Sequence, residues 1–329
     1  MAIRYLSVCS GIEAATVAWH QLGWEAVAYS EIEPFPCKVL AHHYPNTPNW
    51  GDMTKFKDWP DATIDALVGG TPCQSFSVAG LRQGLEDPRG ELMLTYLAIA
   101  ARYQPRWVVW ENVPGVLSSN GGRDFGAFLG ALGELGYGWA YRVLDAQWFG
   151  VPQRRRRVFV VGCFADQSSA AAVLFERESV RGHTSQTQPQ NEVAWWNGNS
   201  VSQTCDAVLY KGQMMPEKNR FPVLALGEKS SFLPTATMME TARTAELITP
   251  SVTVLDQLKA IGLSTVSMPL ESCGRVYLRR ATPTEVERLQ GFPDDYTNIP
   301  GAKDGPRYKA LGNSMAVPVM RWIGERICS

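Results

Sequence analysis

Strand patterns and helix patterns alternate along the first 165 residues, and this alternation constrains the fold more than any other feature of the sequence. Short apolar runs are followed by stretches whose apolar residues recur at helical spacing. Parallel strands need crossovers of this kind, so the pattern predicts a parallel sheet with helices on both faces. The expected strands are 3–8, 24–29, 64–68, 107–110 and 158–162, and the expected helices are 14–22, 34–43, 91–103 and 125–135.

The alternation ends after Phe164. Residues 165–275 are rich in Ser, Thr, Gln and Pro, which predicts a loop-rich region of low regularity. Regular patterning resumes near Arg275, with a helix over 284–290 and a turn over 291–295. The segment 311–327 is expected to form a loop followed by a helix.

Length, charge and cysteine usage narrow the possible functions. The chain has 329 residues, 45% of them apolar, enough for about two domains. Its 31 Lys and Arg balance 32 Asp and Glu, so contact with nucleic acid must come from a local patch. The sequence has neither an apolar run of about 18 residues nor a secretory pattern, which predicts a cytoplasmic protein without a membrane partner. The seven cysteines form no C-x-x-C pair, which argues against a disulfide framework and a metal site.

Cys73 lies in a loop that directly follows the strand 64–68 and two glycines. Ligands of open α/β sheets bind beyond the carboxyl ends of the strands. Such a cysteine is either a buried structural residue, the commonest fate of cysteine, or a nucleophile within reach of a substrate. The flanking turn residues favour exposure and therefore the nucleophile.

Glu111 ends the apolar strand 107–110. It is either a capping or solvated loop acid, or a proton donor whose pKa is raised by burial.

The run 153–157 reads Gln-Arg-Arg-Arg-Arg and leads directly into a buried strand. In extended backbone, Gln153, Arg155 and Arg157 share one face and the two other arginines share the opposite face. The run is either a solvated basic edge or a segment with one face in a cleft, where arginine binds phosphate or a carbonyl oxygen.

The segment 8–13 forms the first strand-to-helix turn, but it lacks the G-x-G-x-x-G pattern. Glu31 ends the second strand and Asp52 precedes the next unit. Each acid is either a surface residue or, in the case of the acid after the second strand, a ligand of ribose hydroxyls.

In their order along the chain, these segments resemble the cytosine-C5 DNA methyltransferase family of bacteria and phages. The resemblance covers nearly the whole chain except about 165–275. It implies a Rossmann-like α/β domain with a mainly parallel sheet, formed by residues 1–164 and 303–329, and a smaller irregular target-recognition domain over 165–302 that includes the segment 288–293. The matching motifs are Val8-Cys9-Ser10-Gly11, Pro72-Cys73-Gln74, Glu111-Asn112-Val113, Gln153-x-Arg155-x-Arg157, Arg288-Leu289-Gln290-Gly291-Phe292-Pro293 and Gly312-Asn313-Ser314.

The resemblance implies methyl transfer from S-adenosyl-L-methionine to C5 of a flipped-out cytosine in duplex DNA. Cys73 matches the nucleophile that attacks C6, and Glu111 matches the residue that binds and protonates N3. Arg157 matches the arginine placed on the cytosine O2. The remaining matched residues, Asn112, Gln153 and Arg155, order the loop and the pocket.

The same resemblance assigns residues to the cofactor and to DNA. Glu31 matches the ribose acid and Asp52 the residue that meets the adenine amino group. The loop around Gly80–Gly90 resembles the loop that closes over DNA, with Ser77 and Arg89 as its DNA contacts. The full cofactor set is Cys9, Ser10, Gly11, Glu31, Ile32, Asp52, Met53, Pro72, Leu92, Asn313 and Ser314, and no metal is implied.

The sequence departs from the family pattern at the cofactor loop. The family usually has an aromatic residue where Cys9 and Ile32 stand, and two glycines where Glu13 and Ala14 stand. The loss of ring stacking implies modest affinity for the cofactor, without affecting the residues of the chemical step.

Residues 165–275 occupy the place of the region that reads the DNA sequence. This region contains Trp195, Trp196 and several cations, side chains that suit contacts with bases and phosphates. Alternatively, the two tryptophans are core residues and the cations are solvated. The expected partners are double-stranded DNA and a cognate restriction endonuclease, with a monomer as the default state.

Three other functions fit the sequence less well. A transfer-RNA methyltransferase of the same family carries a Cys-Phe-Thr tripeptide in its recognition region, and this chain has none. A silent DNA-binding homologue would not need Cys73, Glu111 and Arg157 together. A nicotinamide dehydrogenase has the strand-helix alternation but needs the glycine fingerprint that is missing here.

Overall fold

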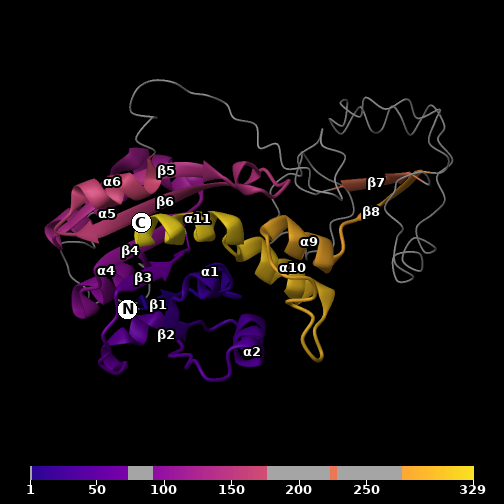
Figure 1. Cartoon of the computed structure of the whole chain (residues 1–329), viewed down its shortest axis with the longest axis horizontal. Coiled ribbons are helices and arrows are strands. Elements are labelled where there is room, and N and C mark those ends of the chain that lie inside the picture. Colours follow the sequence, from indigo (N-terminus) through magenta and orange to yellow (C-terminus); the bar gives the residue numbers. More distant parts are fainter. Residues whose placement is uncertain (1, 73–91, 176–222, 228–275) are drawn as a thin grey trace.

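A computed structural model describes residues 2–72, 92–175, 223–227 and 276–329 (Figure 1). Its centre is a six-stranded sheet in the order β2-β1-β3-β4-β6-β5. Strands β1 to β4 pair in parallel, and β6 runs antiparallel to both β4 and β5. The expected Rossmann-like α/β domain with a mainly parallel sheet is therefore confirmed. The strands are β1 (Arg4–Val8), β2 (Glu25–Ser30), β3 (Ala66–Gly69), β4 (Trp107–Asn112), β5 (Tyr137–Asp145) and β6 (Arg156–Phe164).

Helices and short 3-10 turns connect these strands. The α-helices are α1 (Ala14–Trp19), α2 (Pro34–His43), α4 (Leu92–Tyr103), α5 (Arg123–Glu134), α6 (Gln167–Leu174), α9 (Pro283–Gln290), α10 (Asp304–Asn313) and α11 (Val317–Cys328). The 3-10 segments are η1 (His20–Leu22), η2 (Met53–Asp58), η3 (Pro114–Gly122) and η4 (Ala146–Phe149). A separate antiparallel pair joins β7 (Val223–Gly227) to β8 (Val276–Arg280). No helix within the described ranges is long and apolar enough to cross a membrane.

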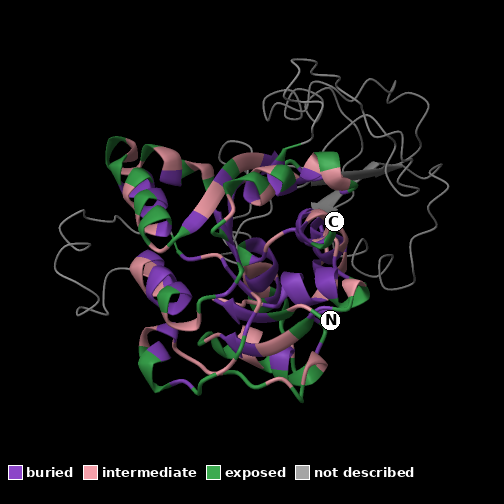
Figure 2. Cartoon of the chain, turned by 60° about the vertical axis from the view of Figure 1, so that its left-hand side comes forward, coloured by how far each residue is buried: buried purple, intermediate pink, exposed green. Residues whose placement is uncertain are grey.

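The sheet separates two apolar layers, because successive side chains of a strand point to opposite faces. In β4, Trp107 and Val109 pack on the face covered by α1, α6, α9 and α11. Val108 and Trp110 pack on the other face, against η2, α4 and α5. The buried residues in Figure 2 accordingly lie along the sheet and the inner sides of its helices. Burial on both faces explains why the strands are nearly continuous apolar runs.

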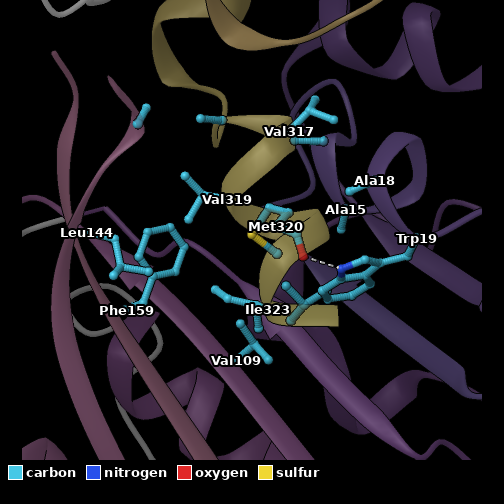
Figure 3. Close-up of a cluster of buried hydrophobic side chains, with 14 of the residues drawn as sticks. Ala15, Ala18, Trp19, Val109, Leu144, Phe159, Val317, Val319, Met320 and Ile323 are labelled. Carbon is cyan, nitrogen blue, oxygen red and sulfur yellow. Dashed lines mark hydrogen bonds between the residues drawn. The ribbon is translucent and has the colours of Figure 1, made fainter. Parts of the chain in front are cut away.

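Helix α11 lies between the sheet and α1 (Figure 3). Val319 and Ile323 face the sheet residues Phe159 and Val109, while the indole Nε1 of Trp19 donates a hydrogen bond to the Met320 carbonyl oxygen over 2.7 Å. This packing joins the first and last segments of the chain in one core.

Helix α9 begins and ends at strong local signals. Thr282 forms a capping box with Glu285, and Gly291 ends the helix with φ of 81°, in the left-handed region that suits glycine. Val286 and Leu289 belong to the same core as α1 and α11. The packing thus places α9 with the sheet, although the sequence analysis assigned it to the recognition domain.

The sequence-based predictions were wrong for one segment and did not include three observed elements. Residues 311–313 end helix α10 instead of forming a loop, and the loop before α11 is confined to 314–316. Strand β5, α6 and α10 were not predicted. Helix α6 follows Asp166, whose carboxylate accepts a hydrogen bond from the Ser169 amide, and it packs against β5 and β6.

Candidate active site at the carboxyl edge of the sheet

The candidate site lies where the strand order changes direction. From β1 the chain proceeds to β2 on one side, and from β3 to β4 on the other. In open α/β sheets, ligands bind beyond the carboxyl ends of the strands at this switch point. The two central strands approach closely there, since a Cβ on Gly69 would lie 2.6 Å from both Cγ2 and the carbonyl oxygen of Val8.

The turn Ser10–Glu13 follows β1. The Glu13 amide donates to the Ser10 carbonyl oxygen over 3.0 Å, and Gly11 adopts φ of 56°. The Gly11 amide donates to Oε2 of Glu31 over 2.7 Å, while Oε1 of Glu31 accepts from the amides of Ile32 and Glu33, each at 2.7 Å. The carboxylate at the end of β2 is therefore held against the turn that follows β1.

Cys9 and Asp52 line the same edge. Cys9 lies 3.4 Å, sulfur to sulfur, from Met53, and burial, aided by the charges of Glu31 and Asp52, raises the pKa of its thiol to about 12. Cys9 is thus a neutral thiol at physiological pH. Oδ1 of Asp52 accepts from the Thr54 amide at 2.9 Å and hydroxyl at 2.8 Å, which orients the carboxylate at the start of η2.

Glu111 and Arg157 form an ion pair at the ends of β4 and β6. The Arg157 Nε lies 3.1 Å from Oε1 of Glu111, and the two side chains are 14% and 11% exposed. Burial raises the pKa of Glu111, and the positive charges of Arg157 and then Arg155 partly offset this effect. Glu111 is therefore a buried carboxyl group at the carboxyl end of its strand and not a solvated loop acid.

The chain that leads toward Cys73 is anchored to β4. The Asn112 amide group donates to the Thr71 carbonyl oxygen over 2.9 Å, and the indole Nε1 of Trp110 donates to the Thr71 hydroxyl over 3.0 Å. Oδ1 of Asn112 also accepts from the Val113 amide at 2.8 Å. A Cβ on Gly70 would lie 3.0 Å from Oε2 of Glu111, so glycine there leaves room for this carboxylate.

The alternation predicted for 153–157 is confirmed. Gln153 and Arg155 are buried, whereas Arg154 and Arg156 are exposed. Arg155 Nη2 donates to the carbonyl oxygens of Gly312 (3.0 Å) and Ser314 (2.7 Å), and Gln153 Nε2 donates to that of Leu289 over 3.0 Å. These two side chains bind the C-terminal segment to the edge of the sheet.

The remaining predicted site residues have different surroundings. Ile32 is 67% exposed, Pro72 and Asn313 are exposed, Leu92 is half-buried at the start of α4, and Ser314 is buried. Cys73, Ser77 and Arg89 lie outside the described residues.

The sequence analysis missed three residues that shape this edge. Thr71 and Trp110 anchor the loop, and Gln290 donates from Nε2 to the Leu311 carbonyl oxygen over 2.7 Å. All three stand within or beside a recognised motif, and that proximity was the available signal. Among the residues that the structure describes, no cluster of three or more His, Cys, Asp or Glu side chains could hold a metal ion.

Comparisons with known proteins identify a matching family and related proteins. Residues 3–329 match the family described as C-5 cytosine-specific DNA methylase. Over 98% of its own length, this chain is 35% identical to a protein of Escherichia phage P1. The match spans only 61% of the length of that relative. The chain is 32% identical to the Type II methyltransferase M.SsoII of Shigella sonnei, covering 99% of this chain and 80% of the relative.

A solved structure shares the fold. The S. pombe Dnmt2 methyltransferase superposes with a TM-score of 0.62 at 15% identity, covering 97% of this chain and 96% of the other. The family match spans nearly the whole chain, and the described part has the corresponding Rossmann-like fold. The chain belongs to the C-5 cytosine-specific DNA methylase family.

Proposed function

We propose that this protein transfers a methyl group from S-adenosyl-L-methionine to C5 of a flipped-out cytosine in duplex DNA. The observation that carries the proposal is the ion pair of the buried Glu111 with the half-buried Arg157, beside the anchored segment that leads toward Cys73. A carboxyl group and a guanidinium held together match two adjacent polar atoms of a cytosine ring, N3 and O2.

Glu111 would act on N3. Carbon C5 of cytosine is a weak nucleophile until a group adds to C6, and protonation at N3 favours that addition. Burial raises the pKa of Glu111, so this carboxyl holds a proton at higher pH than an exposed glutamate does. The positive charge of the Arg157 guanidinium suits the O2 atom as negative charge moves toward it.

Cys73 is the proposed nucleophile. Its sulfur, as thiolate, bonds to C6 while N3 takes the proton of Glu111, which converts C5 into an enamine carbon. C5 would then take the methyl group as the bond between that carbon and the cofactor sulfur breaks. The C5 proton would leave to a base, N3 would return its proton to Glu111, and the C6–S bond would break to restore the aromatic ring. Asn112 positions the loop by its hydrogen bond to Thr71.

The turn after β1 and the acids beside it fit S-adenosyl-L-methionine, which supplies an electrophilic methyl group and leaves as S-adenosyl-L-homocysteine. Glu31 stands at the end of the second strand, the position that suits ribose hydroxyls, and its carboxylate is already oriented by three backbone amides. Asp52 is proposed to meet the adenine amino group. The exposed Ile32 offers an apolar surface to the base without the ring stacking of an aromatic residue.

We further propose that the predicted recognition region, 165–302, reads the DNA sequence through its part between α6 and α9, with Ser77 and Arg89 as additional DNA contacts. A DNA substrate places the reaction in the cytoplasm of a bacterial or phage-infected cell. Relatives named Type II methyltransferases favour a cognate restriction endonuclease as partner, and the proposed state is a monomer.

One relative raises a second candidate. The phage P1 protein is named a DNA N-6-adenine-methyltransferase. Methylation of an exocyclic amine proceeds by direct attack of nitrogen on the methyl group and needs no cysteine adduct. The Glu111 and Arg157 pair favours cytosine, and the modified base itself decides between the two.

The test measures modified bases in DNA from cells that lack their own cytosine and adenine methylases. Cells express the wild type, Cys73→Ala, or Cys328→Ala, which removes an exposed thiol at the end of α11 and serves as the control. We expect 5-methylcytosine in one short sequence context with the wild type and the control, and none with Cys73→Ala. Bisulfite sequencing identifies that context.

Three outcomes would contradict the proposal. N6-methyladenine without 5-methylcytosine would favour the second candidate. Persistence of 5-methylcytosine in Cys73→Ala would exclude the covalent role of Cys73. Neither base, from folded protein that binds S-adenosyl-L-homocysteine, would exclude DNA as the substrate under these conditions and direct the search to RNA.

A further inference from the structure

Glu13 is the least expected residue of the turn that follows β1. The related family usually has glycine at this position. Glu13 nevertheless adopts the left-handed backbone conformation that glycine favours, with φ of 64° and ψ of 60°. Its side chain is buried, with 1% of the residue exposed. Burial raises the pKa of Glu13, and the hydrogen bonds from Ser7 and Thr16 partly offset this effect. A carboxyl group in this conformation and at this depth needs strong local interactions to hold it.

A set of hydrogen bonds converges on the Glu13 carboxylate. Oε1 accepts from the Ser7 hydroxyl, and Oε2 accepts from the Thr16 amide at 3.0 Å and the Thr16 hydroxyl at 2.5 Å. The Thr16 hydroxyl oxygen lies 2.6 Å from the Tyr5 hydroxyl and 3.0 Å from the Tyr29 hydroxyl.

The number of protons that each hydroxyl can donate shows which group is the final acceptor of this network. Thr16 has one hydroxyl proton, so when it donates to Glu13 both tyrosines donate to Thr16. Burial and the nearby Glu13 charge raise the pKa of Tyr5 and Tyr29, which keeps both hydroxyls protonated. All side-chain donors thus point inward, and Glu13 is the acceptor on which they end.

The network connects the elements on both sides of the turn. Ser7 belongs to β1 and Thr16 to α1, and the Glu13 amide itself closes the turn on the Ser10 carbonyl oxygen. Tyr296 adds a third contact, because its hydroxyl donates to the Ile12 carbonyl oxygen over 2.8 Å. The turn that carries Gly11 is therefore held in place from β1, α1 and the C-terminal segment.

We propose that Glu13 is a positioning residue for cofactor binding, whose carboxylate holds the turn Ser10–Glu13 in its binding conformation through Ser7 and Thr16. This inference rests on the proposed function, in which this turn binds S-adenosyl-L-methionine. It assigns to side-chain hydrogen bonds the task of holding a backbone conformation that otherwise suits glycine. Restoring glycine therefore weakens binding, although it relieves the backbone conformation.

The experiment measures binding of S-adenosyl-L-homocysteine to the full chain by titration calorimetry, well below the melting temperature of each variant. The variants are Glu13→Gly, Glu13→Gln and Ser7→Ala. Ala165→Gly is the matched control, because Ala165 is exposed at φ of 57° and has no polar side chain. This substitution relieves the same left-handed backbone conformation and removes no side-chain hydrogen bond.

We expect Glu13→Gly to weaken binding about tenfold, from the loss of all three hydrogen bonds to the carboxyl group, and Glu13→Gln and Ser7→Ala to weaken it by about threefold. Ala165→Gly should bind like the wild type. Amide hydrogen exchange over residues 10–13 should accelerate in Glu13→Gly. In methyl transfer, KM for S-adenosyl-L-methionine should rise while kcat at saturation is retained, a split that general destabilisation would not produce.

The outcomes separate this inference from the proposed function. A wild type that fails to bind S-adenosyl-L-homocysteine contradicts the proposed cofactor site itself. A wild type that binds, with Glu13→Gly binding equally or more tightly, overturns the role of Glu13 and leaves the proposed function intact. If Glu13→Gly does not fold, unchanged affinity in both Glu13→Gln and Ser7→Ala overturns the role instead.

Discussion

Nε of Arg157 lies 3.1 Å from Oε1 of Glu111 because two neighbouring strands run in opposite directions. Glu111 pairs with Phe159 in the antiparallel ladder, so Arg157 is its diagonal neighbour on the same face of the sheet. The pair is held at the carboxyl end of β4, next to Gly70. This geometry leads to the first two predictions below.

Glu111→Gln should lower kcat by about 10²- to 10⁴-fold, the usual contribution of a positioned proton donor. Glutamine keeps the shape and a hydrogen bond to N3 but cannot supply the proton. Steady-state methyl transfer to duplex DNA measures the effect. Glu134→Gln, which changes an exposed glutamate at the end of α5, is the control. A rate within twofold of the wild type for Glu111→Gln would contradict the role of Glu111.

Glu111 should also give stability a distinct pH dependence. Burial raises its pKa in the folded protein, so the folded state binds this proton more tightly than the unfolded chain. The resulting stabilisation is fully present below the ordinary pKa of glutamate and is lost as the pH rises through the raised value. The free energy of unfolding of the wild type should therefore fall relative to Glu111→Gln as the pH increases from about 4 upward.

Urea unfolding of both proteins at closely spaced pH values measures this difference. Glu134→Gln, measured in parallel, accounts for the general effect of one charge. The prediction is contradicted if the free energy of unfolding of the wild type, relative to that of Glu111→Gln, stays constant or rises as the pH increases. Burial would then not be the dominant effect on the pKa of Glu111.

Asn112→Ala should destabilise the protein by about 1–3 kcal/mol, because the Thr71 carbonyl and the Val113 amide both lose a partner. Since Thr71 leads toward Cys73, kcat should fall as well, while affinity for S-adenosyl-L-homocysteine is retained. Chemical unfolding, kinetics and calorimetry check the three parts. Ser118→Ala removes an exposed hydroxyl bonded to the Gly115 carbonyl and should change stability by less than about 0.5 kcal/mol. Unchanged kcat in Asn112→Ala would mean that this anchor does not position the loop.

Gly69→Ala should destabilise the protein by about 1–3 kcal/mol or more, because the new Cβ would lie 2.6 Å from Val8 atoms of the adjacent strand. Gly130→Ala is the matched control: Gly130 lies within α5 with nothing within 4 Å of its Cβ position. There the substitution should stabilise by up to about 1 kcal/mol through helix propensity. Thermal unfolding compares the two. Equal stabilities for Gly69→Ala and the wild type would contradict the close approach of β1 and β3.

The elements with strong local signals were predictable. Helix α2 was expected over 34–43 and occurs there, and α4 (Leu92–Tyr103) fills the described part of its expected range, 91–103. Strand β5 was missed because its burial does not follow a simple alternation. Helix α10 was missed because it contains Gly305, Pro306 and Gly312, residues that favour turns; only the burial of Arg307 and Leu311 against the rest of the protein makes this segment helical.

The sequence was enough to predict the α/β class, the family motifs and the edge of the sheet where the first three motifs meet. The motifs at 8–11, 72–74 and 111–113 each stand at the end of an expected parallel strand, and such strands end at one edge of a sheet. Only the tertiary structure decided which side chains touch. Glu111 and Arg157 are far apart in the chain, and their contact depends on the antiparallel register of β6. Arg155 likewise reaches Ser314 only because α11 packs against the sheet. Such contacts depend on strand direction and long-range packing, which local sequence patterns do not encode.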